Sequence, residues 1–373
     1  MKFKALLALS VVTGSSAFAA FPVGDGEAFL TGTAGYRYDD NLYLSNTGAK
    51  STGVATFKPG VSIEFGTDAL AKNILSFSEE FIRYTGASSQ NNELAQANYN
   101  GTYSDTKAKI NLTASYAENA QNNRDARLNG IIVENTLESV NPKFEWALSP
   151  KTAFDAAATW EKNDYKTAGF SDRKSWYVPV NFYYEIAPKL QASAGYRHRT
   201  DDQAGAADGS DNFYNLGAKG EFTPKLTGSF NIGVNERKTK SFGTAKSSKD
   251  SSVGIISKFD FAFSDKTTFR ASVGNDYQNG GTGATQKVLK IGGGVTSSLS
   301  QQLSVDASLD YSKNDYLVGT RSDDLWNTKV GATYKYNKYV DLKGDYTYQN
   351  NASNVAGSDF KSNVFSVSAS VRY

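Results

Sequence analysis

The sequence predicts an all-β protein, a closed antiparallel transmembrane up-and-down β-barrel of about 18 strands (about 16 to 20), with short periplasmic turns and longer extracellular loops. Three observations support this prediction. Apolar and polar side chains alternate over segments of about 10 to 15 residues, a short turn recurs at a nearly fixed spacing, and the chain opens with the pattern of a secretory signal. No stretch approaches the roughly 18 consecutive apolar residues that a transmembrane helix needs.

Residues 1–19 predict a cleaved signal peptide. Two lysines precede the apolar run 5–12, and the small residues at 17–20 place cleavage after Ala19 or Ala20. The apolar run is too short to cross a bilayer, and the alternative is a buried N-terminal helix. We therefore expect residues 20–373 to form a single barrel domain.

The composition excludes several classes of protein. Because there is no cysteine, a disulfide framework, thiol chemistry and a lipidated N-terminal cysteine are excluded. Loss of the signal removes two lysines, so 40 − 2 = 38 basic residues balance 38 acidic ones, and a nucleic-acid partner has no electrostatic support. The mean hydropathy of −0.48 is typical of a soluble protein, but it also suits a membrane barrel, in which only alternate residues face lipid.

The recurrent turn organises the later two thirds of the chain. It occurs at residues 148–151, 186–189, 222–225, 263–266 and 299–302, with a weaker version at 336–338, and the intervals are about 36 to 41 residues. Each interval holds two strands and a longer polar loop, whereas a propeller blade of similar length would need four shorter strands. The first third adds predicted strands at 27–44, 53–65, 73–84, 94–103, 107–117 and 135–147. The even total places both termini on the periplasmic side.

Alternation gives each strand an apolar and a polar face. No charged residue falls on the apolar face of strands 140–148, 174–186, 303–311 and 340–348. Alternation alone cannot say which face is inside, and a soluble β-sandwich is the alternative. Strand length, the signal and aromatic residues near both strand ends favour an apolar face toward lipid. The predicted aromatic girdles comprise Phe144, Trp146, Trp176, Tyr184, Tyr196, Phe222, Phe263, Tyr277, Tyr311, Trp326, Tyr336 and Tyr373.

The opposite face supplies the predicted lining of a pore, since a barrel of 16 to 18 strands leaves an aqueous channel. The candidates are Lys143, Glu145, Asp155, Glu185, Arg197, Arg199, Lys219, Glu221, Lys258, Asp260, Arg270, Asp306, Asp310, Lys329, Asp341, Lys343, Asp345 and Arg372. Both signs are interspersed without a ring of one sign, which predicts weak ion selectivity. For any single residue, the alternative is that it pairs across strands and fills space.

The last segment, 363–373, alternates without a break and ends the chain on an aromatic residue. Its apolar face carries Phe365, Val367, Ala369, Val371 and Tyr373. This ending resembles the C-terminal signal that the barrel-assembly machinery of the bacterial outer membrane reads, and the alternative is an ordinary final strand. We expect this strand to pair with segment 27–44 and so close the barrel.

Residue patterns for catalysis are not found. There is no Gly-x-Ser-x-Gly elbow, cysteine–histidine metal cluster or P-loop, so we predict no enzyme activity, no cofactor and no metal. Residues 208–211 and 39–41 contain carboxylates that could hold a divalent cation, although a solvated loop is the preferred interpretation of the first.

Four short segments carry a family resemblance: residues 36–42 (YRYDDNL), 59–61 (PGV), 180–184 (VNFYY) and 194–197 (AGYR). They resemble the putative β-barrel porin 2 family of Gram-negative outer-membrane proteins. The resemblance implies an outer-membrane barrel that acts as a porin, and we expect it to pass small hydrophilic solutes. We expect its other partners to be outer-membrane lipid and, through the last strand, the barrel-assembly machinery. The alternative that the resemblance implies is a non-enzymatic accessory barrel in polysaccharide export. Oligomeric state stays open.

Overall fold

The computed structural model describes residues 21–122, 131–244 and 246–373, so the predicted signal peptide lies outside the described residues. Nearly all of this part is strand. The elements are β1 (Phe21–Val23), β2 (Gly26–Asp39), β3 (Thr52–Phe65), β4 (Ala71–Tyr84), the 3-10 helix η1 (Ser88–Gln90), β5 (Asn92–Ser104), β6 (Ala108–Gln121), β7 (Val133–Ser149), β8 (Thr152–Ala157), β9 (Thr159–Tyr165), β10 (Arg173–Ala187), β11 (Leu190–Gln203), β12 (Gly209–Thr223), β13 (Leu226–Thr239), β14 (Ser248–Ser264), β15 (Thr267–Asn279), β16 (Thr285–Ser298), β17 (Leu303–Tyr316), β18 (Ser322–Lys335), β19 (Val340–Ser353) and β20 (Phe360–Arg372). Among these residues, no helix has the length and apolar character to cross a membrane.

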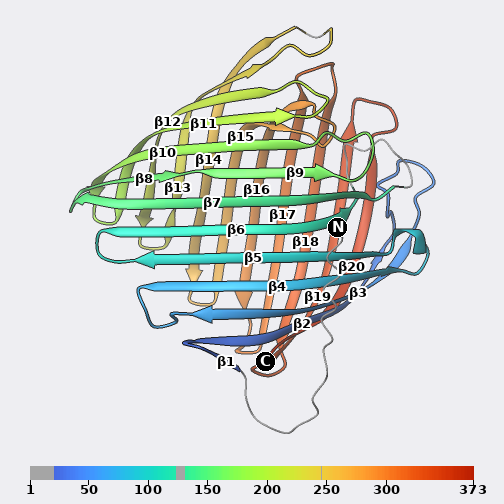
Figure 1. Ribbon diagram of the computed structural model, residues 1–373, viewed down its shortest axis with the longest axis horizontal. Helices are drawn as coiled ribbons and strands as arrows, with labels where there is room; N and C mark the ends of the chain where they lie inside the picture. Colours follow the sequence, from blue (N-terminus) through green and yellow to red (C-terminus); the bar gives the residue numbers. More distant parts are fainter. Residues whose placement is uncertain (1–20, 123–130, 245) are drawn as a thin grey trace.

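The strands form one closed antiparallel barrel (Figure 1). Each wall strand pairs with its neighbours in sequence, and β2 pairs with β20 to close the sheet. β8 and β9 are two parts of one strand, interrupted at Ala158, and both lie between β7 and β10. The short β1 pairs with β2. Counting β8 and β9 together and setting β1 aside leaves 18 wall strands, which confirms the predicted fold and strand number.

The closing seam joins the two ends of the barrel. Thr31 lies opposite Arg372, and the pairing continues to Asp39 opposite Val364. At the end of the seam near the short turns, the N–H of Tyr373 donates to the carbonyl of Leu30 at 2.8 Å, and the N–H of Leu30 donates to the carbonyl of Tyr373 at 2.7 Å. The last residue therefore takes part in the seam, and the expected pairing of the first and last long strands is confirmed.

A repeated side-chain hydrogen bond explains the recurrent short turn. The hydroxyl of Ser264 accepts the N–H groups of Lys266 and Thr267, and Ser149, Thr223 and Ser300 make the same pair of bonds. Short hydroxyl side chains stabilise turns in this way because they satisfy N–H groups that leave the strand ladder. The turn after β10 has Ala187 at the corresponding position and instead places Lys189 at a φ of 63°.

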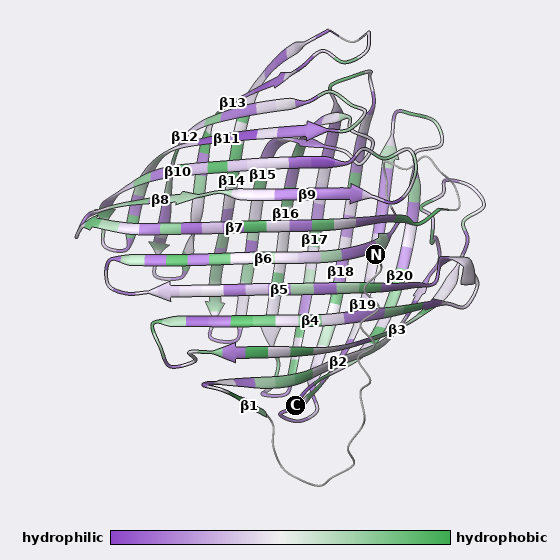
Figure 2. Cartoon of the chain, viewed as in Figure 1, coloured by the Kyte–Doolittle hydropathy of each residue, from purple (hydrophilic) through white to green (hydrophobic). Residues whose placement is uncertain are grey.

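Contacts between distant strands show which face is inside. Lys219 on β12 lies 3.5 Å from Glu145 on β7, and Arg197 on β11 lies 2.8 Å from Asp276 on β15. Side chains of non-neighbouring strands can meet only across the concave side of a curved sheet. The polar face is therefore the interior, and the apolar face, which carries exposed side chains such as Leu216 and Val367, is the exterior. Figure 2 shows hydrophilic and hydrophobic residues interspersed along many of the strands.

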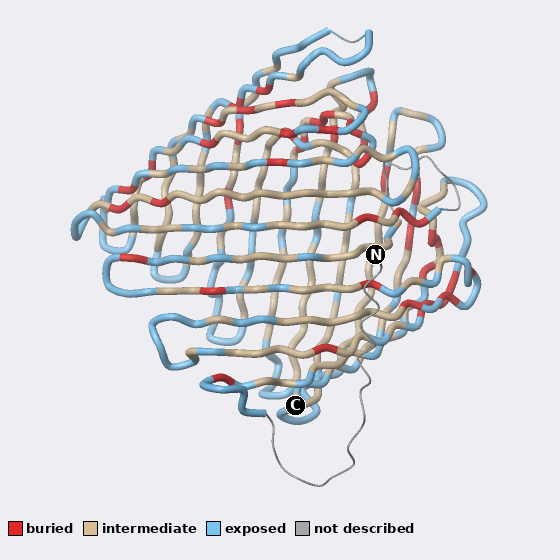
Figure 3. The backbone as a smooth tube through the Cα atoms, viewed as in Figure 1, coloured by how far each residue is buried: buried red, intermediate tan, exposed pale blue. Residues whose placement is uncertain are grey.

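The buried apolar residues are not at the centre of the barrel. Leu42 and Ala87 in the loops that follow β2 and β4, and Ile132 just before β7, pack with Val54, Ile82, Tyr84 and Leu94 of the wall in one cluster. Figure 3 shows buried residues concentrated toward the loop ends of the strands. The described loops are thus anchored onto the wall by this cluster.

Candidate functional site

The predicted lining residues fall into three groups by exposure. The exposed ones are Lys143, Lys258, Asp260, Arg270, Asp310, Asp341 and Arg372. Those of intermediate exposure are Glu145, Glu185, Arg199, Lys219, Glu221, Asp306, Lys329, Lys343 and Asp345. Asp155 and Arg197 are buried, and neither offers surface to a solute. The interior is therefore uneven, with one packed region and one open region.

The packed region is an ion-pair network near the loop end, which we call the arginine cluster. It comprises Arg197, Arg199, Arg237, Asp201, Asp211 and Asp276. At its centre, Asp211 accepts hydrogen bonds from Arg197 at 2.6 Å, Arg199 at 2.6 Å and Arg237 at 3.1 Å. The side chains of Asp211 and Arg237 are 0% exposed. Burial of charges without water is tolerated only when they are paired and hydrogen-bonded, as here.

The arginine cluster ties together strands that are not neighbours. Arg197 on β11 also bonds Asp276 on β15, and Asn235 on β13 donates to the same carboxylate at 2.5 Å. Above them, the N–H of Ser171 in the β9–β10 loop donates to the carbonyl of Gly281 in the β15–β16 loop at 3.0 Å. The wall from β9 to β16 is thus curled inward, and its loop end is filled by side chains.

A second set of contacts fills the same side of the barrel nearer the turns. The Lys219 ammonium lies 3.5 Å from the centroid of the Tyr183 ring and 3.5 Å from Glu145. Tyr183 donates to Asp155 at 2.8 Å, and Asn181 donates to the other oxygen of this carboxylate at 2.7 Å. These bonds account for the burial of Asp155.

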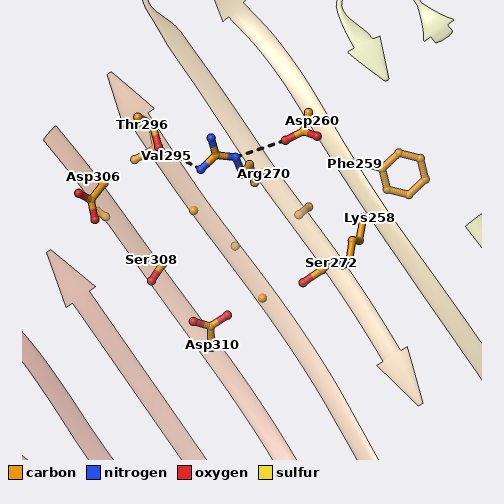
Figure 4. Close-up of a pocket in the computed structure, with 15 residues that line it drawn as sticks. Lys258, Phe259, Asp260, Arg270, Ser272, Val295, Thr296, Asp306, Ser308 and Asp310 are labelled. Atoms are coloured by element: carbon orange, nitrogen blue, oxygen red, sulfur yellow. Dashed lines mark hydrogen bonds and ion pairs between the residues drawn. The ribbon is translucent and has the colours of Figure 1, made fainter. Parts of the chain in front are cut away.

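The open region is a hollow of about 510 Å³ on the wall formed by β14 to β17, which we call the glycine hollow (Figure 4). Its inward residues are Lys258, Asp260, Arg270, Ser272, Gly292, Gly294, Thr296, Asp306, Ser308 and Asp310. Two of them, Gly292 and Gly294, have no side chain, so the floor of the hollow is backbone. A cavity of this size with a few placed polar groups is in the range of small-molecule sites.

The glycine hollow keeps its charges largely free. Arg270 lies 3.4 Å from Asp260, and both side chains are more than half exposed. This ion pair therefore contributes little to the stability of the fold. In the described part of the chain, Lys258, Asp306 and Asp310 have no ion-pair partner within 4 Å. These groups therefore remain available to a solute.

The segment 39–41, considered as a cation site, instead locks the loop end of the seam. The Asn41 amide donates to the carbonyls of Ser45 and Lys361, both at 2.8 Å. Asp40 accepts the backbone and side-chain N–H groups of Asn363 at 2.7 and 2.6 Å. Both Asp40 oxygens are thus engaged with the start of β20.

The segment 208–211 is also explained by protein contacts. The N–H of Gln203 donates to Asp208 at 3.0 Å, and this bond, with the nearby Lys240, holds the pKa of the Asp208 carboxyl below its ordinary value. Asp211 belongs to the arginine cluster. Within the described ranges, no group of three or more potential metal ligands is found.

The outward aromatic residues lie mostly on the exposed face. Trp146, Trp176, Tyr184, Tyr196, Phe263, Trp326 and Tyr336 are exposed, and Phe144, Phe222, Tyr311 and Tyr373 are partly exposed. The prediction for Tyr277 is wrong, because this side chain is 0% exposed and its hydroxyl donates to Asp250 at 2.5 Å. On the last strand, Phe365, Val367, Ala369 and Val371 are exposed and Tyr373 is partly exposed.

The residues that sequence reasoning missed are those of the arginine cluster beyond Arg197 and Arg199. Asp201, Asp211, Arg237 and Asp276 lie near strand ends, where a polar residue is expected to be solvated. Residues 197–237 contain three arginines and several aspartates, but this pattern indicates an ion-pair network only when the curvature of the strands is known. The glycines at 292–294 were visible as a run in a strand, where glycine marks a close approach or missing packing.

A closed antiparallel barrel with an apolar exterior and a charged interior defines the class of outer-membrane β-barrels. Consistent with this class, residues 199–373 match the family described as putative beta-barrel porin 2, which confirms the resemblance over that part of the chain. The segments 36–42, 59–61, 180–184 and 194–197 lie before the matched residues, so the match does not test them.

Two solved structures of similar length share the fold. OpdK with vanillate, from Pseudomonas aeruginosa, is 12% identical with a TM-score of 0.52, over 94% of this chain and 99% of that chain. A BenF-like porin from Pseudomonas fluorescens Pf-5 is 10% identical with a TM-score of 0.52, over 94% and 100%. The FrpB iron transporter from Neisseria meningitidis is 10% identical with a TM-score of 0.49. The alignment covers 87% of this chain but only 62% of the longer transporter. No curated protein matches.

Proposed function

We propose that the protein is an outer-membrane channel through which small hydrophilic solutes diffuse passively. One observation carries the proposal: the described residues form a wall of 18 strands, and no domain among them occupies the interior. Barrels of 16 to 18 strands are wide enough for an aqueous path. The glycine hollow supplies hydrated polar surface along that path. The likeness to a BenF-like porin and the match to a porin family support the same function.

We propose weak ion selectivity for this channel. The exposed inward groups include Lys143, Lys258 and Arg270 as well as Asp260, Asp310 and Asp341. Because the two signs are interspersed, the field along the barrel has no long stretch of one sign. Export through the signal peptide 1–19, assembly through the last strand and lipid contact through the aromatic girdles are part of the same proposal.

A second candidate function is a non-enzymatic accessory barrel in polysaccharide export. The long-range inward ion pairs favour it, since those from β7 to β15 fill one side of the interior. In that case, the barrel would serve as a scaffold, and solute passage would be absent.

Planar-bilayer recording separates the two functions. Purified full-length protein is expected to insert in discrete steps of conductance, with a cation-to-anion permeability ratio within about threefold of unity. Folding is checked by electrophoresis in detergent, in which a folded barrel migrates differently before and after heating. A folded barrel without conductance steps would contradict the channel function and favour the accessory role.

A further inference from the structure

The register of four strands places opposite charges at the two ends of one row in the glycine hollow. Lys258 on β14 lies opposite Ser272 on β15, Ser272 opposite Gly292 on β16, and Gly292 opposite Asp310 on β17. Neighbouring strands are about 4.8 Å apart, so the backbones of Lys258 and Asp310 are separated by about 14 Å along the wall. Between them lie one hydroxyl and one residue without a side chain.

The missing side chain at Gly292 determines the shape of the row. The position that a Cβ would take lies 2.5 Å from Oδ1 of Asp310 and 2.8 Å from Oγ of Ser272. The Asp310 carboxylate therefore leans over β16 toward Lys258, and it shortens the gap that a ligand must span. Any larger residue at 292 would occupy this space.

The adjacent row has a different pattern. Asp260 on β14 lies opposite Arg270 on β15, Arg270 lies opposite Gly294, and Gly294 lies opposite Ser308 on β17. Asp306 lies on β17, the same strand as Asp310. Lys258 on β14 thus has no ion-pair partner among the described residues, Arg270 on β15 pairs with Asp260, and two unpaired carboxylates stand on β17 (Figure 4).

We propose that the glycine hollow is a binding subsite for small zwitterions, of the size of an amino acid or a dipeptide. The solute's carboxylate lies toward Lys258 and Arg270, and its ammonium lies toward Asp306 and Asp310. An extended dipeptide spans about 7 Å, which suits the shortened gap. An anion alone would face the two free carboxylates, and a cation alone would face Lys258. This proposal rests on the proposed channel in so far as it names the class of solute that passes.

Binding to the folded barrel tests the proposal without reliance on conductance. The probes are glycylglycine and its uncharged analogue N-acetylglycinamide, titrated against the full-length protein in detergent by ligand-observed saturation-transfer NMR. We expect glycylglycine to bind more tightly than the analogue by about two- to fivefold, the worth of exposed charge pairs. Lys258→Gln and Asp310→Asn should each remove most of this preference.

A matched pair of variants tests the site itself. Gly292→Val fills the hollow and should abolish binding, whereas Gly293→Val adds the same side chain to the outer face, where the nearest heavy atom is 4.0 Å from the Cβ position. Should Gly292→Val fail to fold, Lys258→Gln and Asp310→Asn carry the test. Equal binding of the two probes to the native protein, or a preference unchanged in the two charge variants, overturns the subsite. Zwitterion binding without conductance would overturn the channel and keep the subsite.

Discussion

The arginine cluster and the glycine hollow are built from the same kind of strand, yet they treat charge in opposite ways. Both lie on the inward face, and both combine arginine with aspartate. In the cluster, Asp211 is completely buried among three arginines, whereas in the hollow Asp310 is exposed and unpaired among the described residues. Wall curvature, and not residue type, therefore decides whether inward charges stabilise the barrel or remain free for solutes.

Curvature acts through the strands that it brings together. Between β11 and β15 the wall curls until Arg197 reaches Asp276, with three strands between them. Between β14 and β17 Arg270 and Asp260 form an exposed pair, whereas Lys258 and Asp310 stay apart. Gly292 and Gly294 on β16 leave the floor of the hollow without side chains. One side of the interior is thus a packed polar core, and the other side is the surface available to water.

Removal of a central carboxylate should give the largest contrast. Asp211→Ala leaves Arg197, Arg199 and Arg237 with fewer anions in a buried site, and the expected loss in the free energy of unfolding is about 3–5 kcal/mol. Asp310→Ala removes an exposed, unpaired charge and should change it by less than about 0.5 kcal/mol. Urea unfolding of both variants in lipid vesicles measures the difference. Similar losses in the two variants would show that the cluster is no more of a structural element than the hollow.

Glycines on the two sides should also differ in their tolerance of a side chain. At Gly254 on β14, a Cβ would lie 2.4 Å from the buried ring of Phe213, so Gly254→Val overpacks the cluster side at an expected cost of about 1–3 kcal/mol. At Gly292 the near atoms belong to Asp310 and Ser272, which can swing into open space, so Gly292→Val should cost less. Urea midpoints of the two variants in vesicles check this order. The reverse order would break the comparison.

Salt should distinguish the two regions by a smaller effect. Buried pairs are screened little, so the stability difference between the native protein and Asp211→Ala should hold between 0.1 and 1 M salt, values at which the screening length is about 10 Å and about 3 Å. The preference of the exposed hollow for glycylglycine should fall toward unity over the same range. Unfolding and NMR titrations at both salt concentrations measure the two trends. A stability difference that disappears at 1 M salt would show that the ion pairs of the arginine cluster are exposed to solvent, which would contradict this prediction.

Most of the fold could be predicted from the sequence because it depends on local patterns. Alternation marks the strands, and the serine and threonine turns mark their short connections, so the strand number and the seam at Tyr373 followed. Lys258 and Asp310, which line the hollow, were among the residues that alternation predicts to face inward.

The rest depends on contacts between strands that are far apart around the wall. Arg237 and Asp276 lie 39 residues apart in sequence, and nothing local indicates that their side chains share one buried network. Such contacts bury Arg197, whereas Asp155 is buried by Asn181 and Tyr183 on the adjacent strand β10. Alternation alone had placed both residues on the lining. Tyr277 was misplaced because its position near a loop matched a girdle, although its side chain packs against Asp250.

The absence of cysteine allows the most direct test of the central claim, that solutes pass along the glycine hollow and not through the cluster side. Ser272→Cys places a thiol in the hollow, and Ser193→Cys places one on the inward face of β11, where the native side chain is buried. A water-soluble cationic methanethiosulfonate reagent is then added during planar-bilayer recording. The account predicts a stepwise fall in current for Ser272→Cys and no change for Ser193→Cys. An unchanged current for Ser272→Cys, or an equal fall for Ser193→Cys, would contradict it.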